Sequence, residues 1–111
     1  MSDTNYIGTV IKILESPKQK ILKNNILITQ FRVQIPQFKH SRMITVTFWG
    51  NLAKDVTTYY KINDYLFVEG YISIRNITNL NSINSKLKKI ELTVLKVYPF
   101  LLSSDHLTTK I

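Results

Sequence analysis

The chain of 111 residues contains no cysteine, and it has only three glycines and three prolines. The lack of cysteine excludes disulfide frameworks and thiolate metal sites, and it fits a cytosol, a bacterial interior or an organelle stroma equally well. No apolar run approaches the roughly 20 residues of a membrane-spanning helix, so we expect no membrane association. The N-terminal segment MSDTNYIGTV carries Asp3 and no basic region, so we expect neither a signal peptide nor a transit peptide.

Acidic residues are also scarce. Fifteen Lys and Arg residues face seven Asp and Glu residues, which gives a formal net charge of +8 and favours a polyanionic partner such as nucleic acid. The carboxylates are scattered without the spacing of a metal site, and no motif places a catalytic partner beside His40 or His106. A phosphate-cradling glycine loop is missing as well. We therefore expect no enzymatic activity, no metal, no cofactor and no small-molecule substrate.

Apolar and polar residues alternate with a period of two, which predicts strands. Strands are predicted at residues 6–14, 26–35, 43–49, 65–75 and 90–98. Asn51 is a suitable N-cap for a short helix at 52–60, and Gly70 inside the fourth strand marks a bulge or bend. The connecting segments are predicted to be a basic turn at 15–25, a loop at 36–42 and a long Asn-rich, basic loop at 76–89.

This order of elements is that of the OB-fold, a small and partly open barrel. We therefore predict an all-β protein: a five-stranded OB-fold barrel with one short helix between strands 3 and 4. The barrel is expected to form one single-stranded nucleic-acid-binding domain at residues 1–98, and residues 99–111 are expected to form a short C-terminal tail.

Ligands of OB-folds bind across strands two and three, between the loop after strand one and the loop before strand five. Both of these loops are rich in lysine here. The first contains Lys18, Lys20 and Lys23, and the second contains Lys86, Lys88 and Lys89. Single loop lysines are usually only solvated, but two clusters on either side of one groove favour contacts with a polyanion.

Trp49, the only tryptophan, ends the third predicted strand. Alternation places it with Thr45 and Thr47 on the face opposite the aliphatic residues. Proteins that bind single strands stack bases on such aromatic residues, at about 1–3 kcal/mol per base, and threonine hydroxyls contact phosphates and sugars. The alternative is that Trp49 packs in a contact between subunits.

Four other residues are candidates for the same surface. Phe38 and Arg42 lie on the loop that joins the two floor strands, although Phe38 has the alternative role of capping the barrel. Arg32 lies on the outer face of strand two, and Arg75 follows the bend at Gly70. An arginine guanidinium both pairs with phosphate and stacks on bases.

The stretch VTFWGNLAKDVTTYYKINDYLFVEGYIS resembles the signature of bacterial-type single-stranded DNA-binding proteins. In that family an aliphatic strand ends in an aromatic residue and glycine, and a Leu-Ala helix, a Lys-x-Gly-Asp turn and a strand ending in Glu-Gly follow. The resemblance is strong at 44–70 and extends over about 6–98. The pair VQIPQFK (33–39) and WGNLA (49–53) is similar to the short plastid-encoded members found in algae and to their cyanobacterial relatives.

The resemblance implies binding of single-stranded DNA with little sequence preference, in support of DNA replication, repair and recombination. Trp49 falls on the family's base-stacking aromatic position, Arg75 on a basic position that contacts DNA, and Phe38 near a second stacking aromatic. The family forms dimers or tetramers, so a homo-oligomer is expected. The implied location is the plastid (chloroplast) stroma if the gene is organellar, and otherwise the bacterial cytoplasm.

The sequence also departs from that family. Met43 and Ile77 stand where the family often has tryptophan, which implies weaker binding that depends more steeply on salt. The C-terminal segment PFLLSSDHLTTKI lacks the family's acidic-aromatic tip. Two alternatives therefore stay open: an OB-fold protein that binds RNA, and an accessory or assembly subunit that kept the fold but lost nucleic-acid binding.

Overall fold

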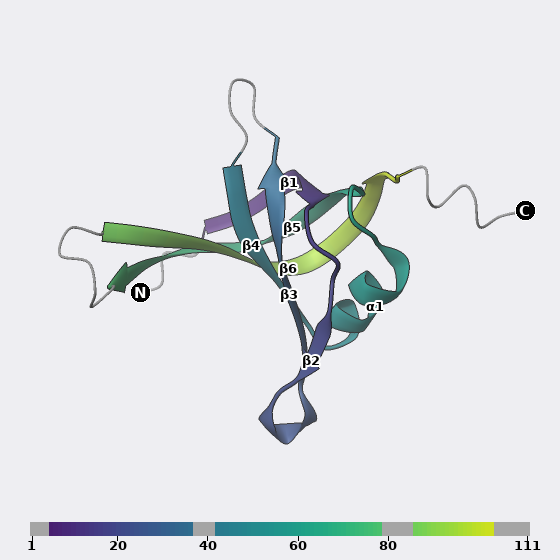
Figure 1. Cartoon of the computed structure of the whole chain (residues 1–111), viewed down its shortest axis with the longest axis horizontal. Helices are drawn as coiled ribbons and strands as arrows, with labels where there is room; N and C mark the ends of the chain where they lie inside the picture. The colour runs from purple at the N-terminus through teal and green to yellow at the C-terminus, as the bar shows by residue number, and fades with distance from the viewer. Residues whose placement is uncertain (1–4, 37–41, 79–85, 104–111) are drawn as a thin grey trace, which may run out of the picture.

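A computed structural model describes residues 5–36, 42–78 and 86–103. Its elements in chain order are β1 (Asn5–Ile13), β2 (Gln19–Ile21), the 3-10 turn η1 (Lys23–Asn25), β3 (Leu27–Ile35), β4 (Arg42–Trp49), α1 (Asn51–Tyr59), β5 (Tyr65–Thr78) and β6 (Lys86–Leu101). Figure 1 shows a strongly curved sheet from which the β2–β3 and β5–β6 hairpins project, with α1 at one side. Within the described residues, no helix has the length and apolar character needed to cross a membrane.

The strands form one sheet in the order β1-β5-β6-β4-β3-β2. Neighbours are antiparallel except β4 and β6, which run parallel. An additional antiparallel pairing joins β1 to β3, with Lys12 opposite Gln34 and Ile13 opposite Val33. This pairing curls the sheet back on itself, as in a partly open barrel. The prediction of an all-β OB-fold with one helix before the fourth long strand is confirmed.

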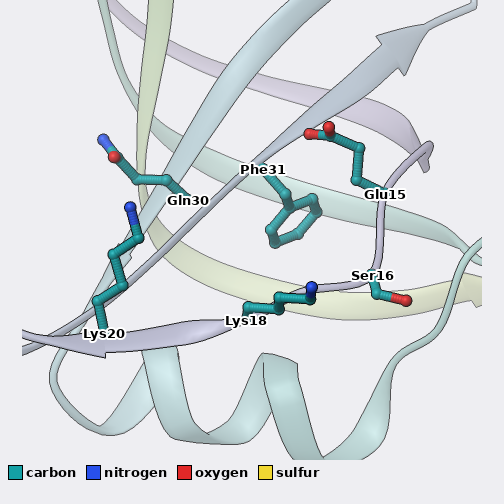
Figure 2. A pocket seen from close by; sticks show the side chains of 6 residues that line it. All are labelled: Glu15, Ser16, Lys18, Lys20, Gln30 and Phe31. Carbon is teal, nitrogen blue, oxygen red and sulfur yellow. The ribbon is translucent and has the colours of Figure 1, made fainter.

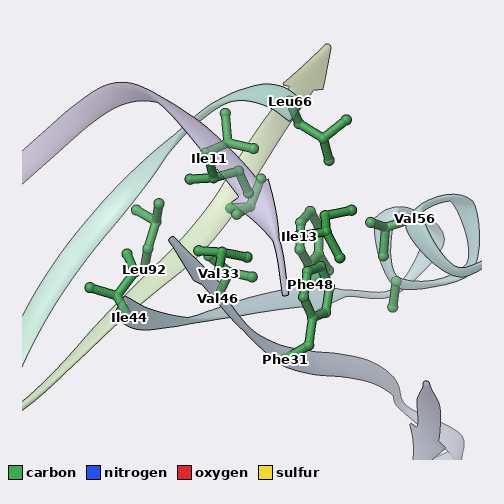
Figure 3. Close-up of a cluster of buried hydrophobic side chains, with 13 residues drawn as sticks. Ile11, Ile13, Phe31, Val33, Ile44, Val46, Phe48, Val56, Leu66 and Leu92 are labelled. Atoms are coloured by element: carbon green, nitrogen blue, oxygen red, sulfur yellow. The ribbon is translucent and has the colours of Figure 1, made fainter. Parts of the chain in front are cut away.

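The core lies inside this curled sheet and is built from the alternate residues of its strands (Figure 3). Phe31 of β3 and Phe48 of β4 are stacked in the part of the core next to α1, with ring centroids 5.6 Å apart. Helix α1 closes one end through Ala53 and Val56, both fully buried. The Thr29 hydroxyl of β3 donates to the Ala53 carbonyl oxygen at 2.9 Å, so α1 packs on the core-facing side of β3.

Two glycines hold positions that other residues would strain. Gly50, with φ 62°, is the N-cap of α1. Asn51, the predicted N-cap, is instead the first helical residue. At Gly70 the register between β5 and β6 shifts, and an added Cβ would overlap the carbonyl oxygen of Thr93. The bulge predicted at Gly70 is confirmed, and the close approach of the β6 backbone explains why a glycine occupies this position.

The structure corrects the bounds of two predicted loops. The basic turn at 15–25 contains β2, which pairs with β3, and the 3-10 turn η1. The predicted loop at 76–89 is largely strand, because β5 continues to Thr78 and β6 begins at Lys86. Lys20 therefore lies on β2, and Lys86, Lys88 and Lys89 lie on β6, rather than on loops.

Strand β6 also runs three residues beyond the predicted end at residue 98, through Pro99 to Leu101. Pro99 has no N–H to donate, but β6 pairs with β4 only at Glu91–Thr93, so in the described part of the chain Pro99 has a strand on one side alone. Proline is tolerated at such edge positions. The division of the chain into a domain at 1–98 and a tail stays a prediction.

Candidate nucleic-acid interface

Trp49 is the last residue of β4, and its side chain is 44% exposed. It lies opposite Ile28 of β3, and Ile28 in turn lies opposite Lys20 of β2. Residues opposite each other on antiparallel strands project from the same face of the sheet. Lys20, Ile28 and Trp49 therefore form a row across three strands on the outer face, which we call the Trp49 row.

The next row on this face joins Gln30 of β3 to Thr47 of β4. The Gln30 Nε2 donates a hydrogen bond to the Thr47 hydroxyl at 3.0 Å, and Thr47 is only 3% exposed. The sequence predicted both Thr45 and Thr47 as contacts for a ligand, and the structure places both on the outer face. Thr45 is half-buried opposite Arg32, whereas the Thr47 hydroxyl is covered and orients the Gln30 amide.

Arg32 forms an ion pair with Glu15, an acidic residue that the sequence did not predict to be part of the site. Its backbone N–H donates to Glu15 Oε1 at 2.7 Å, and its Nη2 donates to Glu15 Oε2 at 3.2 Å. The backbone hydrogen bond first, and the guanidinium second, lower the pKa of the Glu15 carboxyl from its usual value. Glu15 thus neutralises part of the positive charge at Arg32, although both side chains remain open to solvent.

An open cleft of about 360 Å³ lies between the β1–β2 connection and β3 (Figure 2). Its walls are formed by Glu15, Ser16, Lys18, Lys20, Gln30 and Phe31. Lys20 belongs both to this cleft and to the Trp49 row, so the two features are continuous. The acidic residue Glu15 within an otherwise basic segment is the signal that could have pointed to the cleft.

The remaining predicted contacts lie farther from Trp49. Lys23 lies on η1 at the end of the β2–β3 hairpin, and exposed Arg42 begins β4 at the other end of the strand from Trp49. Lys89 is exposed on β6, two residues before Glu91, which lies opposite Thr45. Lys89 is therefore on the same face as Thr45.

For three further residues the structure gives only the backbone position. Arg75 of β5 lies opposite Lys89, while Lys86 and Lys88 of β6 lie opposite Thr78 and Asn76. Phe38 lies outside the described residues. The structure thus brings Trp49, Lys20, Arg32 and Lys89 onto one sheet surface, and it leaves the position of Phe38 open.

This surface can stack an unpaired base and neutralise phosphates. Trp49 offers an exposed aromatic side chain, and Lys20 offers a cation two strands away, about 10 Å across the sheet. A cationic surface with exposed aromatic rings is the arrangement that binds single-stranded nucleic acid. Within the ranges that the structure describes, no cluster of three or more His, Asp or Glu residues could hold a metal ion.

The family model described as "Single-strand binding protein family" matches residues 5–100. A putative single-stranded DNA-binding protein of Trieres chinensis, ycf41, is 39% identical over 108 residues, which cover 94% of this chain and 96% of that protein.

Solved structures share the fold. The SSB domain of a Synechococcus protein matches with a TM-score of 0.68 and 24% identity over 88% of this chain and 98% of the other. The small single-stranded DNA-binding protein of Streptomyces coelicolor gives a TM-score of 0.76 at 16% identity, over 90% and 97%. The mitochondrial single-stranded DNA-binding protein Rim1 of S. cerevisiae gives 0.75 at 12%, over 92% and 100%.

Proposed function

This chain belongs to the single-strand binding protein family, and from that premise we propose that it binds single-stranded DNA with little sequence preference. The resemblance drawn from the sequence is confirmed. The proposed role is support of DNA replication, repair or recombination by binding alone, without a chemical step. The observation that carries the proposal is the half-exposed Trp49 in a row with Lys20 on one sheet face.

In the proposed mechanism, one base stacks on the Trp49 indole, which contributes about 1–3 kcal/mol without reading the sequence. The backbone of the strand passes Lys20 on one side of the indole and crosses the sheet toward Arg32 and Lys89. The Gln30 amide, held by Thr47, contacts a sugar or base between them. The proposed path of the strand extends beyond this centre through contacts with six further residues: Lys23, Arg42, Arg75, Lys86, Lys88 and Phe38.

We also propose that the protein forms a homo-oligomer in a plastid stroma or a bacterial-type interior. β1 is an edge of the sheet, and in the described part of the chain its residues Asn5–Ile11 pair with β5 alone. An edge strand invites pairing with another chain. Tyr6 and Tyr71, 47% and 41% exposed, add an aromatic patch beside that edge. Analytical ultracentrifugation tests this proposal, and a monomer at micromolar concentration would contradict it.

The DNA proposal is tested by titrating the Trp49 fluorescence with oligo-dT and then with oligo-rU at a low and a high salt concentration. We expect DNA to quench the emission, and the apparent affinity to fall as salt rises. Tighter binding of oligo-rU than of oligo-dT would favour the RNA-binding alternative, because stacking alone does not distinguish the sugars and such a preference requires contacts with the 2′-hydroxyl. A lack of quenching together with no gel shift by either oligomer would favour the accessory subunit that does not bind.

A further inference from the structure

The cleft between the β1–β2 connection and β3 has the size and the position of a subsite for one nucleotide. Its volume of about 360 Å³ is within the range of small-ligand pockets, which begins near 300 Å³. Figure 2 shows the Phe31 side chain inside the ring of Glu15, Lys18, Lys20 and Gln30. Through Lys20, the cleft adjoins the Trp49 row, so a strand with one base on Trp49 would bring a neighbouring nucleotide to it.

The charge of the cleft suits a phosphate at its mouth. Lys18 and Lys20 are both exposed, and Arg32 offsets the negative charge of Glu15 at an Nη2–Oε2 distance of 3.2 Å. The local charge is therefore positive. A lysine ammonium is a compact, strongly hydrated charge on a flexible stem, and it is a common partner of phosphate.

The Glu15 carboxylate gives the cleft a hydrogen-bond acceptor whose position is fixed by Arg32. A carboxylate has about four acceptor positions, and the hydrogen bonds from Arg32 occupy two at Glu15, whose side chain is 42% exposed. The Gln30 Nε2 donates one of its two N–H groups to Thr47 at 3.0 Å, so the amide keeps its Oε1 as an acceptor beside its second N–H. Acceptors at a base edge select an exocyclic amino group, and a glutamate that accepts from cytosine N4 is one such pairing.

We propose that this cleft binds one nucleotide of the strand and favours cytosine over uracil or thymine through the Glu15 carboxylate. The inference rests on the proposed function and adds a modest base preference to it. Phe31 provides the apolar floor, Lys18 and Lys20 hold the phosphate, and Glu15 accepts from the amino group at C4. Uracil and thymine present a carbonyl oxygen at C4, which repels the carboxylate, and their N3–H is a donor at a different position on the base edge.

The test compares oligo-dC with oligo-dU of equal length, whose bases differ in the group at C4 and in the proton at N3. Binding of fluorescently labelled oligomers is measured by anisotropy at pH 8, where cytosine is unprotonated. We expect the wild type to prefer oligo-dC by about fivefold, the lower end of a direct contact to a base edge. Glu15→Gln should bring this ratio to about one, because the amide can turn to match either base.

Two variants serve as controls. Lys18→Ala should weaken both oligomers equally and leave their ratio unchanged. Asp55→Asn removes one negative charge from the exposed side of α1, outside the cleft lining, and should change neither affinity nor ratio. A wild-type ratio near one, or a preference that persists in Glu15→Gln, would overturn the inference while binding itself stands. Failure of both oligomers to bind the wild type would overturn the proposed function and this inference together.

Discussion

Phe48 and Trp49 are consecutive residues of β4 with opposite environments. Phe48 is fully buried and stacks on Phe31 in the core, whereas Trp49 is 44% exposed on the outer face. The alternation of a strand produces this division, because successive side chains point to opposite sides. One aromatic residue therefore stabilises the barrel, while its neighbour is left available to a ligand.

Replacing Trp49 should separate binding from stability. Trp49→Ala should weaken binding of labelled oligo-dT by about 5- to 150-fold, which corresponds to the loss of about 1–3 kcal/mol of base stacking. The midpoint of urea unfolding should change little, because the side chain lies outside the core. Fluorescence anisotropy with the labelled oligomer and urea unfolding followed by circular dichroism measure the two effects.

Trp49→Phe and Phe48→Leu are the matched controls. Trp49→Phe keeps an aromatic face and should retain most of the affinity. Phe48→Leu should lower the free energy of unfolding by about 1–3 kcal/mol, because it leaves a gap beside Phe31. Unchanged affinity of Trp49→Ala would remove Trp49 from the binding surface.

Lys20→Ala should reduce the salt dependence of binding. A lysine that neutralises one phosphate contributes about 0.7 to the slope of log affinity against log salt concentration for single strands. We therefore expect the slope, measured by anisotropy over a series of salt concentrations, to become shallower by about this amount. Lys54→Ala on α1 is the control, since the helix packs on the other side of β3 and β4 from Trp49. An equal loss of slope in both variants would indicate a general effect of net charge.

The long strands could be predicted from the sequence because each strand buries one face in the core, so that apolar and polar residues alternate along it. Phe31, Val33 and the other alternating residues locate β3 and β4, and the same alternation places Trp49 outside. Strand β2 gives no such signal, since all three of its residues are exposed and it forms by pairing with β3. The sequence likewise did not predict the end of β5 and the start of β6, because this segment is rich in Asn and Lys, which have low strand propensity. Backbone pairing alone extends the hairpin there.

The side-chain pairs of the site could not be predicted for a different reason. Gln30–Thr47 and Glu15–Arg32 each join residues 17 apart in the chain. Such contacts depend on the register of β3 against β4 and on the path of the β1–β2 connection. A shift of one residue in register would move every side chain of the strand to the other face. Alternation indicates which residues share a face, but it does not fix which of them are opposite each other.

The hydrogen bonds between Arg32 and Glu15 should make stability depend on pH. The pKa of the Glu15 carboxyl in the folded protein is below its usual value of 4.5, first through the Arg32 backbone N–H and then through the guanidinium. A lowered pKa means that the ionised form favours folding, so its contribution is complete above about pH 4.5 and is lost as the pH falls through the folded pKa.

Urea unfolding of the wild type and Glu15→Gln across pH 3 to 8 measures this contribution. The wild type should be the more stable at neutral pH, and the difference should shrink below pH 4.5 as the carboxylate takes up a proton. The effect should be small, because both side chains are open to solvent. A difference that stays constant over the whole range would show that the charge of Glu15 does not contribute to stability.

Asp64 should hold the end of β6 against the turn before β5. This aspartate is fully buried; its Oδ2 accepts from the Lys61 backbone N–H at 2.8 Å, and its Oδ1 accepts from the Ser103 backbone N–H at 2.7 Å. An asparagine has only one acceptor oxygen, so Asp64→Asn would turn an amino group toward one of the two donors. We expect a loss of about 2 kcal/mol in the free energy of unfolding, measured by urea denaturation. Asp55→Asn, on the exposed side of α1, should stay within about 0.5 kcal/mol of the wild type. If the two variants unfold at the same urea concentration, Asp64 does not anchor the chain at Ser103.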